Sequence, residues 1–189
     1  MRITRLLVSL FALGALAAFS GSAQAQSAKA TVGFMLAGVS PGGEEKRVVD
    51  AENGIRTVTP SPQPGEWRLK YVRALAQNSI YTLVLNHRLE EVDACRYELH
   101  ITGKETQVTM KFDFSRATEI AFPKRDPRAP DGTTLVDYLG ASVERCEPSK
   151  DRPCQEVDGN RFGYIPASEA ELRAAFDHFQ ATICAKSIY

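Results

Sequence analysis

The chain has 189 residues, and 43% of them are hydrophobic, while its 23 basic and 23 acidic side chains give a formal net charge of zero. A chain with this balance has no electrostatic reason to bind nucleic acid or an anionic membrane surface. A chain of this length can bury a hydrophobic core without metals or many disulfides.

Residues 1–25 have the three parts of a secretory signal peptide. Two arginines open the segment, Leu6–Phe19 is an almost unbroken apolar run, and Ala23-Gln24-Ala25 provides a small-x-small cleavage site. The alternative is a membrane anchor, but a run of 14 residues is shorter than the roughly 20 that a spanning helix needs. No cysteine follows the cleavage site, which argues against a lipid anchor. We therefore predict cleavage after Ala25 and a periplasmic or secreted protein.

Removal of this segment leaves 164 residues, which we expect to form a single exported domain, residues 26–189. The formal charge of this domain is −2, because the two arginines are lost and no acidic residue is lost with them. We expect no nucleic-acid partner and no membrane span in the mature chain. The expected partner is an unidentified protein or small ligand, and the sequence leaves the oligomeric state open.

All four cysteines lie in the mature chain, and export to an oxidising compartment makes disulfides the expected state of an even number. A zinc site would need Cys-x-x-Cys or a nearby histidine, and a redox site would also favour Cys-x-x-Cys. Neither pattern is present. Of the three possible pairings, we favour Cys146–Cys154, which closes a short ring, with Cys95–Cys184, which would join a strand to the last helix.

The N-terminal part of the mature chain predicts a short helix and a hairpin. The apolar segment 28–37 fits a helix or a strand, and Gly38 after it favours a helix stop. Asn53-Gly54 lies between two short β-prone runs and is typical of a tight hairpin turn. The Pro-rich residues 60–66 predict a connector that is too short to separate two domains.

Alternation of apolar and polar residues is clearest in the middle of the chain. It predicts an antiparallel hairpin at 95–114 with one buried face. The same pattern predicts strands at 66–72 and 79–87, a short one at 118–122, and another at 133–146 with a bulge or bend at Gly140. The three prolines and several charges of residues 123–132 predict an exposed loop.

The period changes to that of a helix near the C-terminus. Ser168 and Glu171 fit a capping box. An apolar stripe follows at helical spacing and needs a sheet to cover; it consists of Leu172, Phe176, Phe179 and Ile183.

These elements predict an α+β fold, in which a curled antiparallel meander of six to eight strands is closed by a C-terminal helix. In element order it resembles the pleckstrin-homology-type superfold, and the resemblance rests on no motif. Short connections favour antiparallel pairing, because parallel strands would need crossover helices.

The sequence shows no local catalytic motif, and we expect no catalytic, cofactor-binding or metal site. His178 is predicted on the solvated side of its helix, His100 on the outward face of its strand and His87 at the end of a strand, and a histidine in such a surface position is more often without a function than catalytic. The acidic residues are expected in solvated loops and turns; they are Glu44, Glu45, Glu90, Glu91 and Asp93. Three aromatic residues are predicted to be core side chains, with a ligand pocket as the alternative, namely Trp67, Tyr81 and Tyr138.

The sequence is compatible with three functions. The first is a non-catalytic binding or structural role in the bacterial cell envelope. The second is an inhibitor or partner of an extracellular enzyme that would present the loop at 123–132 or at 146–154. The third is a small hydrolase whose residues converge from different strands. A deep pocket with a partnered histidine or carboxylate would favour the hydrolase, and a protruding ordered loop would favour the inhibitor.

Overall fold

The computed structural model describes residues 27–50, 52–75, 79–124, 129–147, 153–157 and 161–185. The predicted signal peptide and its cleavage site lie outside these ranges. None of the helices in these ranges combines the length and the apolar character that a membrane-spanning segment requires.

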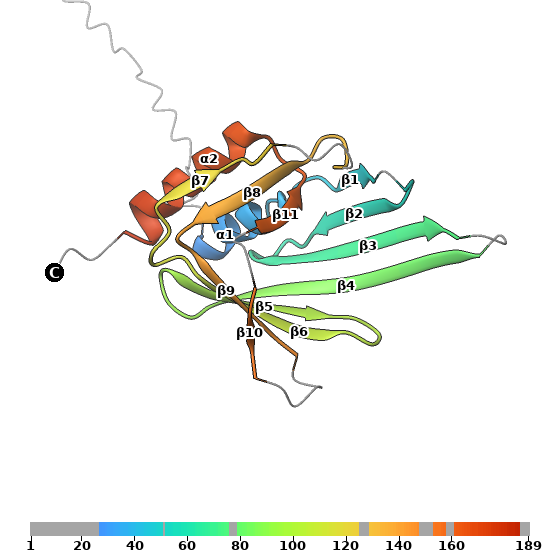
Figure 1. Ribbon diagram of the computed structural model, residues 1–189, viewed down its shortest axis with the longest axis horizontal. Helices are drawn as coiled ribbons and strands as arrows, with labels where there is room; N and C mark the ends of the chain where they lie inside the picture. The colour runs from blue at the N-terminus through green and yellow to red at the C-terminus, as the bar shows by residue number, and fades with distance from the viewer. Residues whose placement is uncertain are drawn as a thin grey trace, which may run out of the picture.

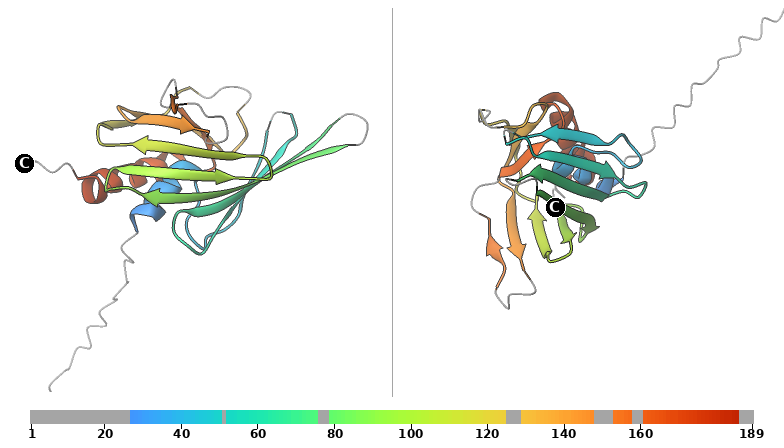
Figure 2. Two further views of the ribbon diagram at one scale, coloured as in Figure 1. Left: turned by 90° about the horizontal axis from the view of Figure 1, so that it is seen from below. Right: turned by 90° about the vertical axis from the view of Figure 1, so that its right-hand side faces the viewer.

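Eight strands form one antiparallel sheet that curls around its inner face (Figures 1 and 2). Strands β1 to β5 each pair with the next strand along the chain, and β9 and β10 extend the sheet beyond β6. The predicted meander is therefore confirmed. The strands are β1 (Lys46–Val49), β2 (Ile55–Pro60), β3 (Glu66–Ala74), β4 (Ile80–Glu91), β5 (Arg96–Thr102), β6 (Gln107–Asp113), β9 (Ser142–Cys146) and β10 (Gln155–Glu156).

Three strands form a smaller antiparallel sheet in the order β11-β8-β7. They are β7 (Glu119–Ala121), β8 (Thr134–Leu139) and β11 (Arg161–Ile165). The helices are α1 (Ala28–Ala37), α2 (Glu169–His178) and a π-helical turn, η3 (Phe179–Ile183). Helix α1 contacts α2, η3, β4 and β11, so it lies between the two sheets (Figure 1). The expected α+β class is confirmed.

Helix α1 begins and ends at the residues that the sequence favoured. The Ser27 hydroxyl accepts a hydrogen bond from the Ala30 amide, and Gly38 ends the helix at φ 69° while its amide donates to the Phe34 carbonyl. Val32 and Met35 are completely buried. The helix is therefore part of the core, although its own sequence has little amphipathic character.

The C-terminal helix packs on the same core. The Ser168–Glu171 capping box forms as predicted. Leu172, Phe176 and Phe179 are at most 3% exposed, and Phe179 packs against Tyr97 and Phe114. Three members of the predicted stripe are thus confirmed as buried. The fourth, Ile183, is only half-buried, because the change from α to π geometry at Phe179 turns the last residues by a different angle.

Two disulfides are present, and they are the pairs that the sequence analysis favoured. Cys95 is bonded to Cys184, which ties the start of β5 to the end of η3. Cys146 is bonded to Cys154, which ties β9 to the start of β10. The first links residues that are 89 positions apart and the second links residues only 8 apart.

Three local expectations need correction. The predicted strand at 133–146 is two strands in different sheets, because Gly140 at φ 87° turns the chain against the Arg116 carbonyl, where a side chain would not fit. The Asn53-Gly54 hairpin exists, but it is no two-residue turn. Asp50 accepts hydrogen bonds from the amides of Glu52 and Gly54, and of the two turn residues Asn53 alone has a positive φ.

The third correction concerns the loop at 123–132. Residues 125–128 lie outside the described part of the chain. Ala129 and Pro130 are buried, contrary to the exposed loop that the prolines and charges suggested. The charged residues that flank them gave no indication that these two side chains would be covered.

Candidate binding groove

The inner face of the large sheet can be followed residue by residue from the strand register. Paired residues of antiparallel strands place their side chains on the same face, and every second residue returns to it. Trp67 of β3 is paired with His87 of β4, which is paired with Ile101 of β5. All three therefore lie on the face that carries the buried Leu89 and Leu99.

One end of this inner face is covered and the other is bare. At the covered end, side chains of β4, β5, β6 and β9 belong to the same core cluster as those of α1 and α2. At the bare end five apolar side chains are half-buried and Tyr81 is exposed, and of these six Ile101 alone touches that cluster. We call this end the groove, and it consists of Leu69, Tyr71, Tyr81, Leu83, Leu85 and Ile101.

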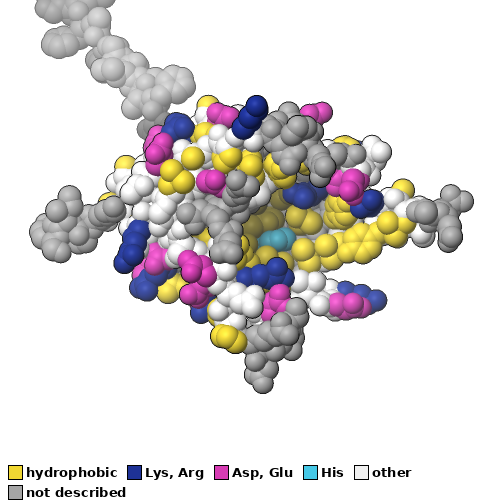
Figure 3. Space-filling view, viewed as in Figure 1, with side chains coloured by type: hydrophobic (Ala, Val, Ile, Leu, Met, Phe, Trp, Pro, Cys, Tyr) yellow, Lys and Arg dark blue, Asp and Glu magenta, His cyan; other side chains and the backbone are white. Residues whose placement is uncertain are grey.

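The space-filling view shows what this arrangement leaves open. Hydrophobic side chains line a hollow on this side of the molecule and continue as a band along β4, and a histidine shows within the hollow (Figure 3). The groove is thus a concave, mainly apolar surface rather than an enclosed cavity.

The groove exists because β3 and β4 are longer than their neighbours. Strand β4 has 12 residues, whereas β5 has 7 and pairs with β4 only from Asn86 onward. The hairpin of β3 and β4 therefore projects beyond the rest of the molecule (Figure 2). We call residues 69–75 and 79–85 the arm.

His87 lies at the inner end of the groove, and its position corrects the sequence analysis. The sequence predicts it at the end of a strand, but β4 continues to Glu91 and His87 is only 9% exposed. Its ring stacks on Trp67 with the centroids 5.1 Å apart and the planes 10° from parallel. Burial lowers the pKa of His87 from 6.5 to about 4, so the ring is neutral at pH 7. Its buried Nδ1 has no hydrogen-bond partner among the described residues.

Two tyrosines form the outer part of the groove. The Tyr71 hydroxyl donates to the Asp50 carboxylate at 3.0 Å, which anchors the ring. Tyr81 meets Tyr71 edge to face, with the centroids 6.3 Å apart, and is 44% exposed. Tyr81 is therefore a surface residue of the groove, contrary to the expected core position. Trp67 and Tyr138 are core residues as expected, and the Tyr138 hydroxyl donates to the Met35 carbonyl at 2.8 Å.

A cationic side chain borders the groove on the β2 side. Arg56 lies on the inner face between Val48 of β1 and Tyr71 of β3. It is half-buried and forms no ion pair within the described part of the chain. A half-buried guanidinium without a carboxylate partner would favour an anionic group beside it.

The outer face of the same sheet carries a histidine cluster that resembles a catalytic arrangement only in its residue types. His100 Nδ1 lies 3.1 Å from Thr109 Oγ1, and its Nε2 lies 3.4 Å from Glu90. The outward position of His100 agrees with the sequence analysis. Glu90 is also held by Arg88 at 2.7 Å. At Arg88, His100 and Thr109 the strands are paired on both sides, so the backbone amides of this part of the sheet are already used within it and are not available to stabilise an oxyanion.

The remaining predicted positions do not gather into a site. His178 is only partly exposed on the last turn of α2, beside Thr182. Asp93 is paired with Arg96, and Glu45 accepts a hydrogen bond from Thr59. The loop at 146–154 falls largely outside the described residues.

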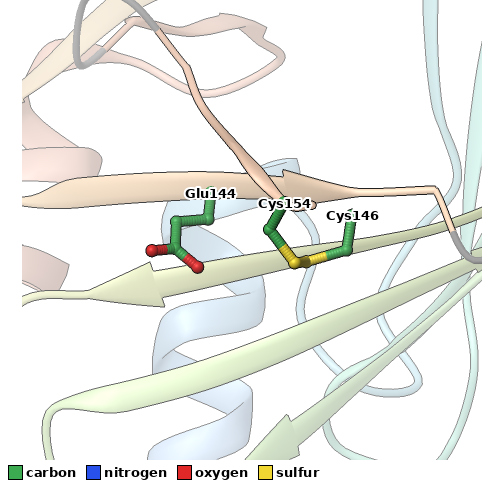
Figure 4. A group of neighbouring side chains, drawn as sticks. All are labelled: Glu144, Cys146 and Cys154. Carbon is green, nitrogen blue, oxygen red and sulfur yellow. A yellow bond between two sulfur atoms is a disulfide. The ribbon is translucent and has the colours of Figure 1, made fainter. Parts of the chain in front are cut away.

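Glu144, Cys146 and Cys154 lie close together in Figure 4, but the two sulfur atoms are bonded to each other. Metal ions bind cysteine as the free thiolate, and the sulfur atoms of a disulfide are not thiolates. This group is therefore a structural disulfide beside a carboxylate and not a metal site.

Comparison with known proteins adds no assignment. No protein-family model, no curated protein and no solved structure matches the chain.

Proposed function

We propose that this protein is an exported, non-catalytic binding domain of the cell envelope, and that it holds an apolar ligand in the groove. The observation that carries the proposal is the contrast along one sheet face. Side chains of the same alternating pattern are buried under helices at one end and left half-exposed at the other. Contiguous apolar surface of this kind typically marks a binding site.

The shape and the border of the groove suggest the ligand class. A long, shallow apolar surface suits an extended and flexible hydrocarbon chain, since such a chain can follow the strands without needing polar partners. Arg56 at the border suits a carboxylate or a similar anionic end. A long-chain fatty acid, or a lipid with a comparable acyl chain, meets both requirements.

Export is supported by the N-terminal pattern and by the cysteines. Residues 1–25 have the features of a signal peptide, and the two disulfides suit an oxidising compartment. A hydrolase is less well supported, because the backbone amides around the histidine cluster of the outer face are already used within the sheet.

The test uses Trp67, which is the one tryptophan of the sequence and borders the groove. Titration with palmitate should change its fluorescence and reach saturation. Leu85→Glu should weaken binding at least about tenfold, because it places a charge on the apolar floor. Val84→Glu is the matched control, since Val84 is the adjacent residue on the opposite face and is 40% exposed. The proposal fails if palmitate causes no saturable change, or if both variants weaken it equally.

A further inference from the structure

His87 carries polar ring atoms at the inner end of the groove that the described part of the protein does not use. Its Nδ1 is buried without a hydrogen-bond partner there, whereas Nε2 is neither hydrogen-bonded to a described residue nor buried. Nε2 therefore belongs to the 9% of His87 that remains exposed. Since His87 is the histidine of the inner face, this nitrogen opens into the hollow (Figure 3).

The backbone beside the ring indicates which nitrogen carries the proton. The Leu85 carbonyl acts on the imidazole and partly offsets the fall of the His87 pKa, although Nδ1 forms no hydrogen bond of good geometry. Nδ1 is the ring nitrogen nearer the backbone, and a proton there faces a carbonyl more favourably than a lone pair would. The neutral ring thus holds its proton on Nδ1, which leaves Nε2 as a hydrogen-bond acceptor that faces the groove.

An acceptor in this position selects a ligand group that donates a hydrogen bond. A carboxylate donates none and is better served by Arg56, and an ammonium group would meet no acidic side chain among the groove residues. A hydroxyl group on a hydrocarbon chain meets the requirement. A plain chain lying over Nε2 would take this nitrogen out of water without a partner, so the site should discriminate against it.

We propose that the groove prefers a hydroxylated long-chain fatty acid, whose hydroxyl donates to His87 Nε2 while its carboxylate lies beside Arg56. This inference rests on the proposed function and names the ligand more closely. His87 is then a residue that determines specificity, and it requires no change of the protein's own contacts.

The strand register also predicts where the hydroxyl lies along the chain. Arg56 of β2 is in one row with Tyr71 of β3 and Leu83 of β4. His87 follows Leu83 by four residues on β4. Two strand spacings and four residues place the two polar positions about 16 Å apart. An extended hydrocarbon chain covers this span with roughly a dozen carbon atoms, so we expect the hydroxyl near the twelfth carbon.

Calorimetric titration with three acids of equal chain length tests the proposal on the unaltered exported protein. The acids are stearate, 12-hydroxystearate and 2-hydroxystearate. The parent should bind 12-hydroxystearate at least about tenfold more tightly than stearate. It should bind 2-hydroxystearate no more tightly than stearate, because that hydroxyl lies next to the carboxylate and far from His87.

Two histidine variants assign the preference to its residue. His87→Phe keeps an aromatic ring beside Trp67 and removes both nitrogen atoms, so it should bind stearate and 12-hydroxystearate equally. His100→Gln is the matched control on the outer face and should keep the preference of the parent.

Three outcomes would overturn the proposal while stearate binding left the proposed function standing. They are equal affinity of the parent for stearate and 12-hydroxystearate, the same gain with 2-hydroxystearate, and a preference that persists in His87→Phe. If the parent bound none of the three acids, the proposed function would fail, and this inference would fail with it. The comparison of the acids on the parent needs no variant, so it decides even if His87→Phe does not fold.

Discussion

The two ends of the inner sheet face have the same alternating sequence pattern, but the side chains are buried at one end and only half-buried at the other. Leu89 and Leu99, near the covered end, are 1% and 6% exposed, whereas Leu69 and Leu85, in the groove, are half-buried. The difference lies in the length of the strands relative to the elements above them. Helices α1 and α2 cover one end, and β3 and β4 continue past that cover. An alternating pattern therefore identifies an apolar face, but not whether the protein itself covers it.

This difference should separate stability from binding. Side chains at the covered end are removed from water on folding, and their loss also leaves a cavity. Side chains of the groove still face solvent, so each contributes less to folding and retains apolar area that a ligand can bury. Substitutions at the two ends should therefore affect different measurements.

The largest expected effect concerns the disulfide at the covered end. Replacing Cys95 and Cys184 together by alanine should lower the free energy of unfolding by roughly 4–5 kcal/mol, because the bond closes a long loop. Replacing Cys146 and Cys154, whose loop is short, should cost roughly 2–3 kcal/mol. Denaturant unfolding of the two double variants measures both losses. Equal losses would contradict the idea that loop length and core position set the difference.

The next effect tests the packing of the C-terminal helix. Phe176 is 3% exposed, and its ring lies 5.6 Å from that of Tyr138. Phe176→Ala should lower the free energy of unfolding by about 3–5 kcal/mol. His178→Ala, on the other side of the helix, should change it by no more than about 0.5 kcal/mol. Chemical denaturation compares the two, and a larger loss at His178 would show that the stripe does not face the core.

Most of the covered end could be predicted from local patterns in the sequence. Helical spacing and a capping box identified α2, and alternation identified β5 and β6, because each of these signals is formed by residues that lie close together in the sequence. The groove could not be predicted, since its existence depends on how far β3 and β4 extend past elements that are distant in sequence. The split at Gly140 depends similarly on the remote Arg116 carbonyl.

The buried position of His87 could have been predicted from the alternating pattern, if the pattern were followed beyond the histidine. The alternation of Tyr81, Leu83 and Leu85 continues through His87 to Leu89, which indicates a strand that does not end at the histidine. Its polar neighbours Asn86 and Arg88 alone indicate a strand end. The continuing pattern was the better guide, because a neutral imidazole stacked on an indole can occupy an apolar position.

The pH dependence of stability tests the boundary between the two ends. Since the pKa of His87 is lowered from 6.5 to about 4 on folding, the unfolded chain binds the proton more readily between these values. The free energy of unfolding should therefore be highest above pH 6.5 and fall by about 3 kcal/mol as the pH drops to 4. His87→Phe should remove this fall, and His100→Gln should leave it in place. Urea unfolding at pH 7 and pH 4.5 makes the comparison, which fails if His87→Phe keeps the dependence of the parent.

Among the apolar side chains of this sheet face and its cover, the smallest effect on stability is expected in the groove, and it makes the sharpest contrast with the covered end. Leu83 is half-buried on the arm, so Leu83→Asn should cost about 1 kcal/mol or less, well below the loss at Phe176. The same change should weaken palmitate binding several-fold, because it replaces apolar contact area with an amide that the acyl chain cannot satisfy. Phe176→Ala should show the reverse, with a large loss of stability and unchanged palmitate affinity in the fraction that remains folded. Unfolding and fluorescence titration of both variants provide the four values. If stability and binding fell together at both positions, the groove would be an ordinary part of the core, and the division of this sheet face into a folding end and a binding end would be wrong.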